Sequence, residues 1–181
     1  MRCVNNDRSI MLRAAAFCAV LLLLSAAGFA GEPRAAWRQA TESELKTVLP
    51  ARAPVQQERI ETEMRTASGI TDGHGKFVAG VVMITAGYSA EGKYSHYFLA
   101  QTPVKISSLS LPAGEYVFGY QHRGEVLVIQ FYEAATGKPV GEVEATLNTS
   151  VTRVESFRIW PPGERSAIQI GRFTLSYQLG E

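Results

Sequence analysis

Apolar and polar residues alternate over most of the chain after Lys76, which is the side-chain spacing of β-strands. Two segments, 77–85 and 126–132, are instead apolar on both faces and rich in β-branched residues, so they predict central strands covered on both sides. The remaining strands are expected over residues 94–100, 104–109, 115–121, 140–147, 151–159, 168–170 and 173–179. A bulge or tight turn is expected at Gly171-Arg172, where the alternation slips by one residue.

Short turns rich in glycine and proline separate these segments, and no helical pattern alternates with them. This arrangement predicts an all-β fold, an antiparallel β-sandwich of about eight or nine strands with a short helical N-terminal segment. A closed barrel is the alternative. The strands that are apolar on both faces favour a sandwich, because they suit a filled core covered on both sides.

Residues 31–75 are more polar and are expected to form a partly helical segment that precedes a β-sandwich domain at 76–181. Thr41 and Glu44 have the spacing of a capping box, which predicts a short helix that stops before Pro50. A second helix is expected from Val55 to about Ala67, because opposite charges there recur four residues apart.

The first thirty residues have the layout of a secretory signal peptide. Three arginines precede an apolar run at 14–24, and small residues follow up to Ala30. The run is shorter than the roughly 20 residues of a membrane-spanning helix. We therefore expect an exported protein, periplasmic or extracellular, that keeps no stable membrane insertion after cleavage. Translation starting at Met11 is as consistent with this layout as a start at Met1.

The composition of the expected mature chain excludes several classes of function. Both cysteines, Cys3 and Cys18, lie in the leader, so the mature chain has no disulfide and no cysteine ligand. Removing the leader also leaves 15 basic and 16 acidic residues, with no basic stripe. Nucleic acid is therefore not an expected partner.

The segment Leu111-Pro112-Ala113-Gly114-Glu115-Tyr116 resembles a hairpin of small exported bacterial β-sandwich domains of unknown function. The resemblance covers about residues 104–179 and extends more loosely to transthyretin-like and carboxypeptidase-regulatory-like modules. It implies a sandwich fold and a non-catalytic role, and it brings no catalytic residues with it.

Candidate binding residues are aromatic. Seven tyrosines are many for a domain of this size, and such side chains can line a ligand-binding face as well as a core. The candidates for a ligand site are Tyr94, Tyr97, Tyr120, His96 and His122.

A metal site is a second possibility, with Asp72, His74, His96 and His122 as its ligands. The competing interpretation is that Asp72 builds a glycine-rich turn and that the histidines are unrelated. Packing or surface histidines need no metal, so no metal and no cofactor is predicted.

The expected function is an exported, non-catalytic binding or accessory domain whose partner is a protein, a glycan or an envelope component. It rests on the lack of a nucleophile motif in the mature sequence. Two alternatives stay open: a β-barrel carrier of a small apolar ligand, and a metal-dependent enzyme that uses the four candidate ligands.

Overall fold

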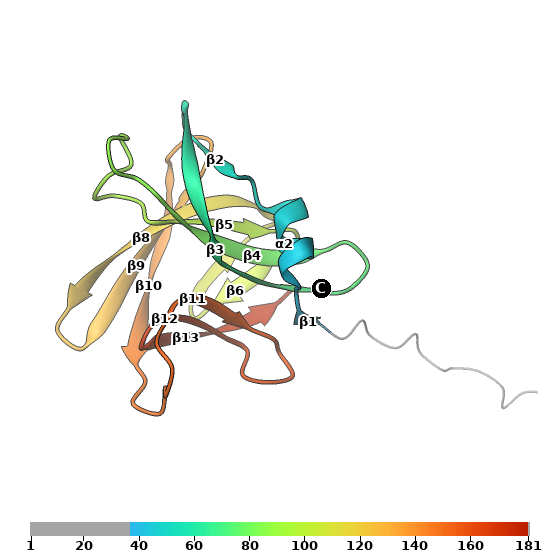
Figure 1. The fold of residues 1–181 in the computed structure, drawn as a ribbon. Coiled ribbons are helices and arrows are strands. Elements are labelled where there is room, and N and C mark those ends of the chain that lie inside the picture. Colours follow the sequence, from blue (N-terminus) through green and yellow to red (C-terminus); the bar gives the residue numbers. More distant parts are fainter. Residues whose placement is uncertain (1–36, 181) are drawn as a thin grey trace, which may run out of the picture. The chain divides into compact units, whose positions relative to one another are not determined.

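Residues 37–180 are described by the computed structural model, and their regular structure is β-strand apart from one short helix (Figure 1). The helix is α2 (Glu42–Val48). The strands are β1 (Arg38–Gln39), β2 (Arg52–Val55), β3 (Glu58–Thr71), β4 (Phe77–Met83), β5 (His96–Ala100), β6 (Val104–Ile106), β7 (Leu109–Leu111), β8 (Gly114–Arg123), β9 (Val126–Glu133), β10 (Pro139–Leu147), β11 (Glu155–Trp160), β12 (Ala167–Gly171) and β13 (Phe173–Leu179). The expected signal peptide lies outside the described residues.

The strands form an antiparallel sheet that curls until its ends lie side by side. Ten of them follow one another in the order β1-β3-β4-β5-β8-β9-β10-β13-β12-β11, and β11 lies beside β3 (Figure 1). The Ile159 N–H of β11 donates to Ser68 Oγ of β3 at 2.9 Å across this seam. The all-β antiparallel class is confirmed, but the predicted sandwich is wrong, because the sheet is a nearly closed barrel.

The hydrophobic alternation is equally compatible with both architectures, which explains the wrong prediction. Alternation fixes which side chains face inward, but it does not decide whether a sheet bends onto itself or splits into two. Closure in this protein depends on β3, which is 14 residues long and shifts its register against β4 between Glu63 and Ser68. An irregularity of this kind bends a strand and increases its twist, which brings β3 round to β11.

The helix predicted from Val55 to about Ala67 is also wrong, because this stretch runs from the end of β2 into β3. Gln56 turns the chain with a positive φ of 54°, and Arg52 then lies opposite Glu61 at 2.6 Å as a cross-strand ion pair. Pairing of β3 with β4 on one side and β2 on the other satisfies its backbone groups, and this outweighs the weak helical preference of the charge spacing. β3 ends before position 75 and β4 begins after it, and the two strands pair within one sheet.

Several local predictions are confirmed. Thr41 Oγ1 accepts from the Glu44 N–H, and Glu44 Oε2 accepts from the Thr41 N–H at 2.8 Å, so the capping box forms. Helix α2 then ends at Val48, ahead of Pro50. Gly171 has a φ of 61° and forms a tight turn with Arg172 between β12 and β13.

The buried residues form two cores, one on each face of the curled sheet. The inner core fills the barrel, and an outer core lies under α2, β2 and the loop that follows β4. Strand β4 serves both, since Val78 faces the barrel interior while Ala79 and Val81 face the outer core. Its two apolar faces, predicted from the sequence, are therefore each covered.

Aromatic rings fill the barrel interior. Phe118 lies 5.0 Å from Phe131 and 6.1 Å from Phe157 between ring centroids, and Phe98 lies 6.0 Å from Phe131. All four side chains are almost completely buried. The middle of the barrel is therefore a packed core rather than an open channel.

Candidate ligand-binding site

One end of the barrel opens into a groove of about 670 Å³, which we call the mouth. Eight strands, β4, β5 and β8 through β13, contribute residues to its wall. Val154, in the β10–β11 loop, lines it as well. A wall drawn from so many neighbouring strands identifies the groove as the open end of the barrel interior. Its apolar lining includes Tyr120, Leu127, Leu147, Val154, Ile170 and Phe173.

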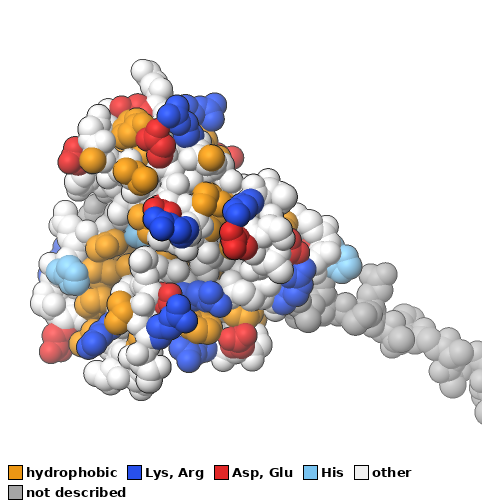
Figure 2. Space-filling model, viewed as in Figure 1, with side chains coloured by type: hydrophobic (Ala, Val, Ile, Leu, Met, Phe, Trp, Pro, Cys, Tyr) orange, Lys and Arg blue, Asp and Glu red, His pale blue; other side chains and the backbone are white. Residues whose placement is uncertain are grey.

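The mouth gathers most of the large apolar side chains that the described residues leave exposed. Four such side chains are exposed by 40% or more, and three of them, Tyr120, Leu147 and Val154, line this groove. Figure 2 shows apolar surface beside a histidine over this part of the molecule. An exposed apolar patch inside a concave site is typical of a surface that binds something.

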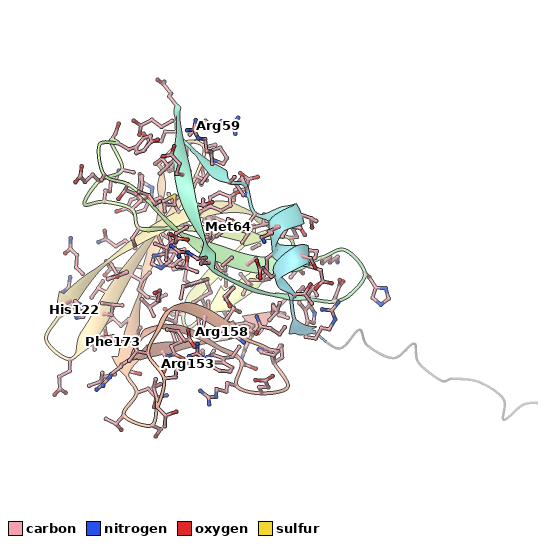
Figure 3. The ribbon with its side chains drawn as sticks, in the orientation of Figure 1. Arg59, Met64, His122, Arg153, Arg158 and Phe173 are labelled. Carbon is pink, nitrogen blue, oxygen red and sulfur yellow. The ribbon has the colours of Figure 1, made fainter. Side chains whose placement is uncertain are left out.

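Pairing of distant strands creates the apolar wall. Leu147 at the end of β10 lies directly opposite Phe173 at the start of β13. His122 at the end of β8 then packs edge-on against Phe173, with 5.3 Å between ring centroids, and both are labelled at this end of the barrel in Figure 3. None of these contacts joins residues that are close in sequence.

His96 lies at the floor of the mouth and is 2% exposed. Its ring stacks on Phe118 at 4.6 Å, and its Nδ1 shares a 2.8 Å hydrogen bond with Ser95 Oγ. Its Nε2 is buried and has no hydrogen-bond partner among the described residues. Burial lowers the pKa of His96 to about 3. The backbone of Ser156 raises this pKa, but its effect is smaller than that of burial. The imidazole is therefore neutral at physiological pH, with one ring nitrogen open to a further hydrogen bond.

Three of the five predicted ligand-site residues, His96, His122 and Tyr120, come together at the mouth. Tyr94 and Tyr97 do not, because both are buried in the outer core on the opposite face of the sheet. Tyr94 packs edge-on against Tyr132 at 5.0 Å. Burial raises the pKa of the Tyr97 hydroxyl, which fits a packing role for this side chain.

The four candidate metal ligands do not converge. Asp72 and His74 lie in the β3–β4 turn, next to the Thr71–Phe77 pair, whereas His96 pairs with Val82 near the other end of β4. Asp72 Oδ1 accepts from the His74 and Lys76 N–H groups at 2.8 and 3.0 Å, so it stabilises the turn. Within residues 37–180, no group of three or more histidine, aspartate and glutamate side chains has the geometry of a metal site.

Sequence reasoning missed Leu147, Val154 and Phe173. Each one falls within an expected strand, at 140–147, 151–159 or 173–179, and looked like an ordinary strand residue, so no local signal marked it. The structure also places Arg65, Arg153 and Arg158 around a second hollow of about 340 Å³ at the seam between β3 and β11. Nothing in their spacing along the chain indicates that they meet.

Comparison with known proteins adds no relative. No family model, no curated protein and no solved structure matches the chain. The resemblance to exported β-sandwich domains stays a prediction. No helix within the described residues has the length and apolar character to cross a bilayer.

Proposed function

We propose that this protein binds a small, largely apolar molecule in the mouth of its barrel and performs no chemistry on it. The observation that carries the proposal is the gathering of Tyr120, Leu147 and Val154, all solvent-exposed, around one groove of about 670 Å³. A volume of this size lies within the range of roughly 300–1,000 Å³ found for small-molecule pockets.

The packed interior restricts where such a ligand can lie. Phe118 and Phe157 fill the barrel beneath His96, so a ligand occupies the mouth and does not pass through the barrel. One side of the ligand then faces the apolar wall, and the other side stays near solvent. This arrangement suits a protein that takes up and releases a molecule.

The polar groups of the mouth are few and placed at its floor. The free Nε2 of His96 and the hydroxyl of Ser95 can orient one polar group of the ligand. A few positioned polar groups within an apolar groove provide orientation and specificity. Export, which the first thirty residues predict, would place this activity in the periplasm or outside the cell.

The test is binding of a neutral, apolar fluorescent probe, N-phenyl-1-naphthylamine, to the purified protein. We expect saturable binding with a fluorescence increase at one site. Leu147→Asp and Val154→Asp should each weaken it about tenfold or more, because a charge would be desolvated where apolar area was buried.

Ile84→Asp is the matched control. Ile84 is 50% exposed, as apolar as the test residues, and lies outside the mouth, so its change should leave binding intact. The proposal is wrong if the wild-type protein fails to bind the probe. It is equally wrong if Ile84→Asp reduces binding as much as Val154→Asp does.

A further inference from the structure

The hollow at the barrel seam adjoins the mouth. Glu155 and Ser156, at the start of β11, line both the mouth and the seam hollow. The seam exists because β3 and β11 lie side by side without a regular ladder, joined by the hydrogen bond from Ile159 to Ser68. A molecule bound in the mouth can therefore extend over Ser156 into the seam hollow.

The two hollows differ in chemistry. The mouth is mainly apolar, whereas three arginines, Arg65, Arg153 and Arg158, line the seam hollow and Glu155 is its one acidic residue. Figure 2 shows Lys and Arg side chains next to the apolar surface, and Figure 3 labels Arg153 and Arg158 on the β11 side of the barrel. An apolar groove that continues into a cationic hollow is complementary to an amphiphile with a negative head.

Arg158 is the arginine available to an external anion. Arg65 pairs with Glu63 at 3.0 Å and Arg153 pairs with Glu155 at 2.8 Å, whereas Arg158 forms no ion pair within residues 37–180. Its Nε is buried without an acceptor, and its guanidinium lies 5.0 Å from the centre of the Trp160 ring. A guanidinium held in this way presents its donors in a planar fork, which matches the geometry of a carboxylate or a phosphate.

We propose that the ligand is a single-chain amphiphile with an anionic head, a carboxylate or a phosphate monoester. The apolar chain lies in the mouth, and the head binds Arg158 in the seam hollow. This inference rests on the proposed function, since it requires the mouth to hold the chain. The Glu155 carboxylate does not repel the head strongly, because Arg153 already neutralises it. The buried Nε of Arg158 then gains the acceptor that it lacks.

The test compares ligands that share one chain and differ in the head. Decanoate, decyl phosphate and decyltrimethylammonium, each below its micelle concentration, are titrated against protein loaded with N-phenyl-1-naphthylamine, and probe displacement gives the affinities. We expect the two anions to bind about tenfold or more tighter than the cation, because a charge-assisted hydrogen bond forms only with them. Salt should reduce this preference.

Arg158→Met is the decisive variant, because methionine keeps much of the apolar stem and removes the charge. It should abolish the preference for anions while the affinity for the neutral probe stays unchanged. Arg59→Met is the matched control, since Arg59 is an exposed arginine of β3 that lines neither the mouth nor the seam hollow. This variant should keep the preference.

The outcomes separate the two proposals. If the neutral probe does not bind, the proposed function fails and this inference fails with it. If the probe binds but the heads are not distinguished, or if Arg158→Met keeps the preference, or if Arg59→Met removes it as Arg158→Met does, only the inference is overturned. Inorganic phosphate is titrated as a last ligand. If it binds as tightly as decyl phosphate, the seam hollow is an independent anion site and the amphiphile is the wrong ligand.

Discussion

Buried, neutral His96 should make the fold sensitive to mild acid. Burial lowers the pKa of His96 to about 3, against an ordinary value of 6.5. Below pH 6.5 the unfolded chain therefore binds a proton that the folded chain excludes, and stability falls as the pH falls. The full slope of about 1.36 kcal/mol per pH unit applies only below the ordinary value of 6.5, so the linkage lowers the unfolding free energy by about 2 kcal/mol between pH 7 and pH 5.

Between pH 7 and pH 5 the effect of His96 on the unfolding free energy can be separated from the effect of the carboxylates. Hydrogen bonds from Arg38 and Thr41 lower the pKa of Glu44 to about 2, so its stabilising contribution is lost only as the pH falls below the ordinary glutamate value of 4.5. Urea unfolding at four pH values across the window, followed by circular dichroism, measures the slope. The wild-type protein should lose about 2 kcal/mol over this range.

His96→Phe should remove most of that slope. Phenylalanine can keep the stack on Phe118 and carries no titratable group, although it loses the hydrogen bond to Ser95. His122→Gln is the control, because His122 is exposed at the mouth and its loss should leave the slope in place. A wild-type stability that stays flat from pH 7 to pH 5, or a slope that survives in His96→Phe, would refute the reasoning.

Two further substitutions test how the barrel closes and how its loop packs. Ser68→Ala leaves the buried Ile159 N–H without its acceptor at the seam and should lower the unfolding free energy by about 1–3 kcal/mol in urea titration; an unchanged midpoint would show that the seam does not depend on this bond. Gly119→Ala places a Cβ 2.0 Å from the Lys93 carbonyl oxygen, so the backbone must shift at a cost of about 1–3 kcal/mol, which should lower the melting temperature. Gly163→Ala is the control and should have little effect, because there is open space around Gly163. Equal losses of stability in the two variants would contradict the packing argument.

The candidate site was predictable only in part, because the alternation along a strand does not show how the strand is used. His96 and Tyr97 are neighbours in β5 and therefore face opposite sides of the sheet, so they were never able to share one site. Tyr94 precedes the strand and turns away, with its N–H bonded to the Ala90 carbonyl oxygen at 2.9 Å. Tyr120 and His122 share one face of β8, as their spacing predicts.

The helix expected in residues 55–67 shows where local signals mislead. Charges four residues apart support a helix by only a few tenths of a kcal/mol each. The same residues in β3 gain two strand neighbours and bury Ile60 completely. Tertiary pairing therefore outweighs a weak local preference.

The sequence by itself determined the features that depend on a few neighbouring residues. It specified the all-β class, the helix cap at Thr41, the turn at Gly171 and the two covered faces of β4. Only the tertiary structure decided that the sheet closes, that a mouth opens at one end and that Arg158 lies beside it at the seam. The physical reason is distance along the chain: the Ser68–Ile159 bond joins residues 91 positions apart, and twist accumulated over all the intervening strands brings them together.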